Sequence, residues 1–180
     1  MPKIVNHEAY RLELLHKATP LFVQYGFEGL TTRQLARHLG VSTGTLYHYF
    51  ANKEQLFECL ARQWMEADMS WVREIFQATP DRQARIRQVG HFLAQNRAKF
   101  DTQNQLVLQF CRLQQQRGID MAPFWDDICA GWDRLTREML ELQSDFAAEL
   151  MGKVIDGIFM QWFQGGQNLD LAAFFERPKF

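Results

Sequence analysis

Residues 31–50, TTRQLARHLGVSTGTLYHYF, decide the fold of this chain. Thr31, with Gln34 at the fourth position, has the reciprocal capping pattern that starts a helix. Gly40 ends that helix, and Ser42 can cap a second short one. Two short helices joined by a tight glycine turn are typical of a helix-turn-helix, whose second helix enters the major groove of DNA.

A plain helical hairpin has the same glycine turn, so the exposed side of the second helix decides between the two interpretations. Thr43, Gly44 and Thr45 are small and lie at its N-terminus, where backbone N–H groups can come close to phosphates. The ring residues that follow can reach phosphates, base edges or thymine methyl groups. These ring residues are Tyr47, His48 and Tyr49.

Lys53 lies in the first turn of a third expected helix, which Asn52 can cap and which continues through Trp64. A cation at this end opposes the helix dipole by roughly 0.3–1 kcal/mol. The position is therefore unfavourable for stability but suitable for a phosphate contact.

The segment from about Leu15 to Leu60 resembles the DNA-binding domain of the TetR (tetracycline-repressor) family of transcriptional regulators. The resemblance covers about a quarter of the chain, and its residues are dense and correctly spaced. The matching residues are Ala18, Phe22, Gly26, Gly29, Leu30, Thr31, Thr32, Leu35, Ala36, Leu39, Gly40, Val41, Ser42, Gly44, Thr45, Leu46, Tyr47, Tyr49, Phe50, Asn52, Lys53, Glu54 and Leu56.

This resemblance implies a set of DNA contacts. Thr32 and Arg33 would lie against DNA at the start of the second helix. Tyr49 and Lys53 would hold phosphates. The reading surface would consist of Thr43, Gly44, Thr45, Tyr47 and His48.

The fold class that the sequence predicts is all-α, because apolar residues recur with a helical period through almost the whole chain. Residues 1–55 would form a three-helix helix-turn-helix DNA-binding domain. The resemblance implies that residues 56–180 form a helical regulatory and dimerisation domain. Beyond the helix-turn-helix, helices are expected over about 7–25, 53–64 and beyond, 81–100, 102–117, 122–142, 144–164 and 170–176.

The expected helix 144–164 is apolar almost all round. A helix of this kind has to be buried on every side. A surface helix of a small monomer always has one side in water, so a second chain would have to cover it. We therefore expect a homodimer in which helices 122–142 and 144–164 pack against their mates. The expected interface residues are Phe146, Leu150, Val154, Ile158 and Trp162.

Aromatic residues of the second domain could line a pocket for a small apolar or aromatic effector, or they could simply be core. The family often encloses such a pocket. The candidates are Trp64, Phe92, Phe110, Trp125, Trp132 and Phe159. No histidine and cysteine cluster suggests a metal, and no cofactor is expected.

Net charge divides along the chain. The total is −1, but it is +2 over 1–55, +3 over 56–119 and −6 over 120–180. A basic first half suggests polyanion contact at one end only. The start of the chain does not resemble a secretory signal, no apolar run is long enough to span a membrane, and the three cysteines lack a CxxC spacing, so a cytoplasmic location is expected.

The function expected from these features is a DNA-binding transcriptional regulator, most often a repressor in this family, that binds a near-palindromic operator as a dimer. A small-molecule effector would release it from DNA. An effector-binding or partner-binding protein of the same fold without a DNA role is the alternative. No nucleophile and base pairing, glycine-rich phosphate loop or paired carboxylates indicate an enzyme. The operator sequence and the effector are not encoded in these patterns.

The dimer is a testable expectation. Light scattering of the purified chain at micromolar concentration should give twice the mass of 21.2 kDa. A monomeric mass would contradict the interpretation of helix 144–164 as an interface helix.

Overall fold

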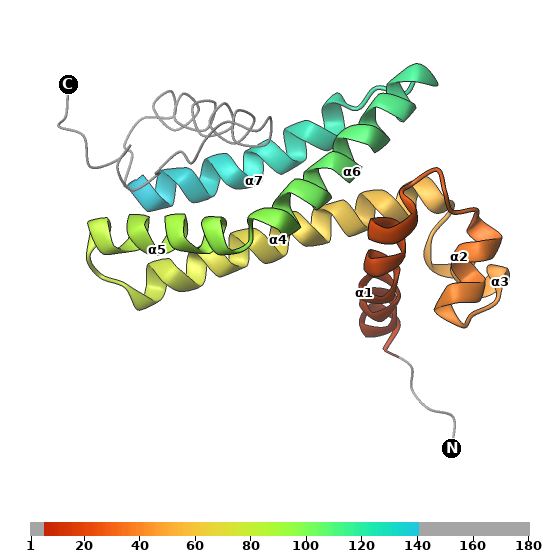
Figure 1. Cartoon of the computed structure of the whole chain (residues 1–180), viewed down its shortest axis with the longest axis horizontal. Coiled ribbons are helices and arrows are strands. Elements are labelled where there is room, and N and C mark those ends of the chain that lie inside the picture. Colours follow the sequence, from red (N-terminus) through yellow and green to blue (C-terminus); the bar gives the residue numbers. More distant parts are fainter. Residues whose placement is uncertain (1–5, 141–180) are drawn as a thin grey trace. The chain divides into compact units, whose positions relative to one another are not determined.

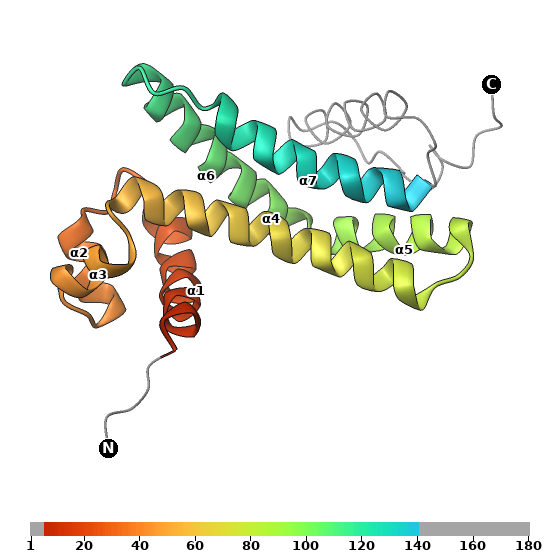
Figure 2. The ribbon, with the colours of Figure 1, turned by 180° about the vertical axis from the view of Figure 1, so that it is seen from behind.

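The computed structural model describes residues 6–140, and all regular secondary structure in this range is helical (Figure 1). The predicted all-α fold class is confirmed. Figure 2 shows the same helices from behind. The helices are α1 His7–Tyr25, α2 Thr32–Leu39, α3 Thr43–Tyr49, α4 Lys53–Ala78, α5 Arg82–Gln95, α6 Arg97–Gln116 and α7 Ala122–Leu140.

Helix α1 has the predicted bounds and runs through Pro20 without interruption. The Asn6 side chain caps its start by accepting hydrogen bonds from the N–H groups of Glu8 and Ala9, at 3.1 and 3.2 Å. Gly26 ends it at a φ of 70°, a backbone region that favours glycine.

The capping signals around α2 and α3 are confirmed atom by atom. Thr31 Oγ1 accepts the Gln34 N–H at 3.2 Å, and Gln34 Oε1 accepts the Thr31 N–H at 2.9 Å. Gly40 has a left-handed backbone, with a φ of 70° and a ψ of 27°, and Ser42 Oγ accepts the Thr45 N–H at 2.9 Å. Local sequence therefore sets both ends of the turn.

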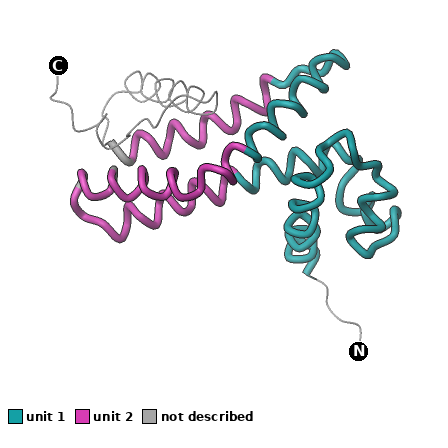
Figure 3. The backbone as a smooth tube through the Cα atoms, viewed as in Figure 1, with its two compact units in different colours: residues 1–64, 102–121 teal, residues 65–101, 122–180 magenta. Residues whose placement is uncertain are grey.

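The chain divides into two compact units, shown in different colours in Figure 3. Unit 1 holds Met1–Trp64 and Thr102–Met121, and unit 2 holds Met65–Asp101 and Ala122–Phe180. Each unit therefore takes its described helices from two separate parts of the chain. The functional division into domains at residue 55 stays a prediction.

A cluster of phenylalanine rings forms the centre of unit 1. Phe22, Phe27, Phe57 and Phe110 are each 1% exposed or less. The Phe27 ring meets Phe57 at 5.3 Å and Phe110 at 4.9 Å between centroids, both edge to face. The C-terminal part of α6 thus shares a core with the first helices.

Unit 2 packs α4 against α7 through Met69, Val72 and Leu135, with Trp132 at the edge of this cluster. Gly131 on α7 lies close to Met69, because a Cβ added there would be 3.0 Å from the Met69 Sδ. The absence of a side chain at Gly131 therefore permits this close approach of α7 to α4.

The prediction of one helix over 81–100 is wrong at its C-terminal end, because the helix is interrupted at Asn96. Helix α5 stops at Gln95, and α6 begins at Arg97. The Asn96 side chain and its backbone N–H both donate to the Phe92 carbonyl, each at 3.0 Å. An asparagine that satisfies the last carbonyls of a helix in this way ends it.

A buried ion pair lies inside unit 2. Asp68 on α4 is 5% exposed, and its Oδ1 accepts a hydrogen bond from Lys99 Nζ of α6 at 2.9 Å. Burial raises the pKa of the Asp68 carboxyl above its ordinary value, and the Lys99 ammonium offsets only part of that effect.

Replacing Asp68 by Asn tests this assignment through pH. The pKa of Asp68 is higher in the folded protein than in the unfolded chain. This group therefore contributes to the free energy of unfolding of the wild type at low pH, and the contribution is lost as pH rises through the folded pKa. D68N lacks this contribution, and the half-exposed Lys99 can turn to water. Urea unfolding from pH 4 to 7.5 should show D68N gaining on the wild type as pH rises. A gap that moves the other way would contradict the assignment.

Candidate nucleic-acid interface

Helix α3 buries one side and exposes the other. Leu46 and Phe50 point inward, with 2% and 1% of their surface exposed. Tyr47 is 54% exposed, although most aromatic rings of this size are largely covered. His48 beside it is also exposed. The predicted reading surface therefore faces outward along α3.

The first turn of α3 brings the backbone to the surface. Gly44 is exposed, and a Cβ added there would meet only Ser42 Oγ, at 3.6 Å, which is an ordinary contact. The glycine is therefore not required by packing within the protein. Thr43 is half-buried, and the Thr45 hydroxyl lies 2.8 Å from Ser42 Oγ. A phosphate could approach the N–H groups of this turn closely.

Helix α2 supports α3 with Leu35, Ala36 and Leu39, all buried. Of its two predicted contact residues, Thr32 lies on the packed face and is half-buried, whereas Arg33 is exposed. The structure thus leaves the Arg33 guanidinium in solvent at the start of α2.

Tyr49 belongs to a cluster of four rings that joins the start of α1 to the end of α3. We call His7, Tyr10, His48 and Tyr49 the ring cluster. The Tyr49 ring lies 5.4 Å from Tyr10 and 5.8 Å from His7, and its hydroxyl is 3.3 Å from His7 Nδ1. Sequence reasoning missed His7 and Tyr10, because their contact with Tyr49 joins residues about forty positions apart.

Lys53 occupies a position that differs from the expected one. Its Nζ donates to the carbonyl oxygens of Phe27 and Leu30, at 2.8 and 2.7 Å, and lies 4.1 Å from the Phe27 ring centroid. Burial lowers the pKa of Lys53 from its ordinary value. These two charged hydrogen bonds connect the start of α4 to the loop before α2, and the expectation from the helix dipole did not include them. The role of Lys53 toward a phosphate stays a prediction.

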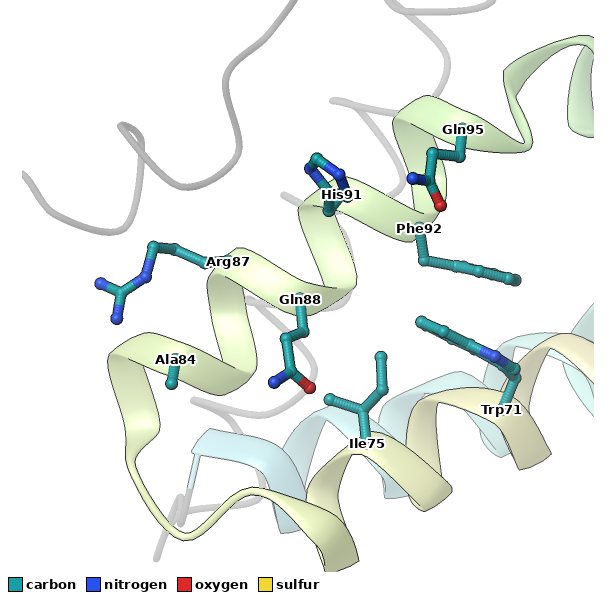
Figure 4. A pocket seen from close by; sticks show the side chains of 8 residues that line it. All are labelled: Trp71, Ile75, Ala84, Arg87, Gln88, His91, Phe92 and Gln95. Atoms are coloured by element: carbon teal, nitrogen blue, oxygen red, sulfur yellow. The ribbon is translucent and has the colours of Figure 1, made fainter.

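Unit 2 contains a pocket of about 440 Å³ between α4 and α5 (Figure 4). Trp71 and Phe92 stack directly on each other at one side of it, with ring centroids 3.4 Å apart and planes 13° apart. The polar groups come mainly from α5. The lining residues are Trp71, Ile75, Ala84, Arg87, Gln88, His91, Phe92 and Gln95.

Phe92 is the one predicted effector residue that lines this pocket. Trp64 and Phe110 lie instead in the core of unit 1, where the Trp64 indole N–H donates to Thr19 Oγ1 at 3.3 Å. Trp132 packs at the edge of the α4–α7 cluster, and Trp125 contacts Phe124. For these four, a role in an effector site stays a prediction.

Several predicted residues lie outside the part of the chain that the structure describes. They are Phe146, Leu150, Val154, Ile158, Phe159 and Trp162.

Within residues 6–140, no group of three or more His, Cys, Asp or Glu side chains could hold a metal ion. No helix in the same range is both long and apolar enough to cross a membrane.

Comparison with known proteins gives the same assignment for the N-terminal segment. Residues 14–60 match the family described as bacterial regulatory proteins, tetR family. The chain is 42% identical over 65 residues to the HTH-type transcriptional repressor AcnR of Corynebacterium diphtheriae, a match that covers 35% of this chain and 34% of that protein. It is 33% identical over 84 residues to the repressor KstR2 of Mycobacterium tuberculosis, covering 47% and 41% of the two chains. The matched segment thus spans well under half of each relative.

Solved structures with a similar fold cover much more of the chain. A TetR-family regulator from Mesorhizobium loti matches with a TM-score of 0.66 and 15% identity, over 94% of this chain and 92% of that one. The regulator FadR of Bacillus subtilis, solved with stearoyl-CoA, matches with a TM-score of 0.63 and 20% identity, over 90% and 91%. At these identities the likeness shows the fold.

Replacing Lys53 by Met tests its structural role. The substitution leaves the carbonyl groups of Phe27 and Leu30 without their charged donor, so the free energy of unfolding should fall by about 1–3 kcal/mol. Lys17→Met is the matched control, because Lys17 makes an exposed pair with Glu13 and its loss should leave the urea midpoint nearly unchanged. Equal urea midpoints for the two variants would refute the role.

Proposed function

We propose that this chain is a transcriptional repressor of the tetR family that binds operator DNA with helix α3, because its residues 14–60 match the model of that family. The observation that carries the proposal is the outward face of α3. Tyr47 and His48 are exposed there, and the open backbone at Gly44 offers N–H groups to a phosphate.

Affinity in this proposal depends on two copies of the chain. A net charge of +2 over residues 1–55 is modest for a DNA-binding domain, so two such domains are needed to supply enough phosphate contacts. The dimer would form through 122–142 and 144–164. It would place two α3 helices in successive major grooves of a near-palindromic operator.

An effector completes the proposal. The FadR proteins of Bacillus subtilis and Thermus thermophilus were solved with stearoyl-CoA and lauroyl-CoA, and they share the fold of this chain. We propose that a small apolar or aromatic compound binds against Trp71 and Phe92 in unit 2. It would favour a dimer whose two α3 helices have the wrong separation for the operator. The protein would act in the cytoplasm, where its DNA is.

Selection of duplexes from a random pool tests the DNA role. The full chain should enrich an inverted repeat whose half-sites are about one helical turn apart. Tyr47→Ala should weaken binding to the selected duplex by about tenfold or more, because a reading contact contributes on the order of 1–3 kcal/mol.

Tyr25→Ala is the matched control, since Tyr25 is another exposed tyrosine, 42% exposed, at the far end of α1 from the ring cluster. It should bind the selected duplex as the wild type does. If no sequence is enriched, the fold serves an effector-binding or partner-binding role without DNA.

A further inference from the structure

The ring cluster contains a hydrogen bond whose direction depends on a proton. We propose, on the premise that α3 binds DNA, that neutral His7 carries its proton on Nε2 and is a positioning residue for Tyr49: when His7 gains a second proton, on Nδ1, the bond between them reverses and the Tyr49 hydroxyl is freed to donate to a DNA phosphate. The bond joins Tyr49 Oη to His7 Nδ1 at 3.3 Å.

The cluster fixes both partners of this bond. His7 is the first residue of α1, directly after the Asn6 cap, and Tyr49 is the last residue of α3. The Tyr49 ring is held from three sides, with centroids 5.4 Å from Tyr10, 5.0 Å from His48 and 5.8 Å from His7. The tyrosine ring is therefore held in place, and the direction of its O–H bond is the remaining freedom.

Hydrogen-bond chemistry then links that direction to the charge of His7. An imidazole without a proton on Nδ1 accepts the Tyr49 O–H, so the tyrosine proton points at His7 and only oxygen lone pairs face outward. A phosphate would meet those lone pairs unfavourably. An imidazolium has protons on both nitrogens, so its Nδ1–H donates to the tyrosine oxygen. The Tyr49 proton is then available to a phosphate oxygen.

The charged and titratable groups near His7 come from α1 and α3. On α1, Glu8 and Arg11 form an ion pair, with Arg11 Nη1 3.7 Å from Glu8 Oε1. On α3, His48 lies 5.6 Å from His7 between ring centroids, and both rings are exposed. The cluster thus holds two imidazoles, the side-chain type that serves as a pH switch in proteins, and His7 is the one that lies within hydrogen-bond distance of the Tyr49 hydroxyl.

Binding of the full chain to a labelled random-sequence duplex at pH 6 and pH 8 tests the proposal. A random sequence is sufficient because phosphate contacts carry no sequence information. Wild-type affinity should rise by about tenfold from pH 8 to pH 6, since charge-assisted contacts strengthen. His7→Phe keeps a ring in the cluster but has no nitrogen, and its gain should be smaller by about threefold or more.

Two further variants guard against a packing effect. His7→Gln lacks the titrating ring and should lose the same part of the pH dependence as H7F. His16→Asn is the matched control, because His16 is an exposed histidine of the same helix that contacts Gln63 rather than α3. It should keep the full wild-type gain.

Tyr49→Phe separates the proposed route from the charge of His7 alone. In the Y49F background, adding H7F should change the pH dependence no further, because the hydroxyl through which His7 acts is absent. Full pH dependence in H7F, or independent effects of H7F and Y49F, would overturn the inference while leaving DNA binding intact. A wild-type chain that binds no duplex at either pH would overturn both proposals.

Discussion

The packing of the Phe27 ring is the constraint on which the rest of unit 1 depends. Its faces and edges contact Phe22 of α1, Phe57 of α4 and Phe110 of α6, and the Lys53 ammonium lies over it. Phe27 itself lies in the loop after α1, so the ring of one loop residue contacts three helices. Within the helix-turn-helix, Leu46 and Phe50 are buried, and Tyr47 and His48 remain exposed.

Sequence reasoning succeeded where a structural decision is made within a few residues. The start of α1 and the caps at Thr31 and Ser42 follow from side chains that bond to backbone groups three residues away or less, and α1 ends at Gly26, whose φ is 70°. It failed at Asn96, where one asparagine bonding to the Phe92 carbonyl separates two helices without any glycine or proline signal.

The candidate site divides in the same way. The exposure of Tyr47, His48 and Arg33 follows from helical periodicity, which the sequence displays directly. The partners of Lys53 and Tyr49 do not, because Lys53 bonds to carbonyls more than twenty positions away and Tyr49 meets a residue at the start of α1. Whether an aromatic residue lines a pocket or fills a core is likewise decided by distant chain segments, as Phe92 and Phe110 illustrate.

The contact between Phe27 and Phe110 limits where a chain of this fold can be truncated or joined to another in a chimera. These rings are separated by more than eighty residues of chain, yet they share one core. A fragment that stops at Trp64 would lack Thr102–Met121 and would present the apolar sides of Phe27 and Phe57 to water. The segment proposed to bind DNA is thus continuous in sequence, but it shares its core with the distant residues 102–121. A chimera that exchanged it between two regulators would have to carry the second half of α6 along with it.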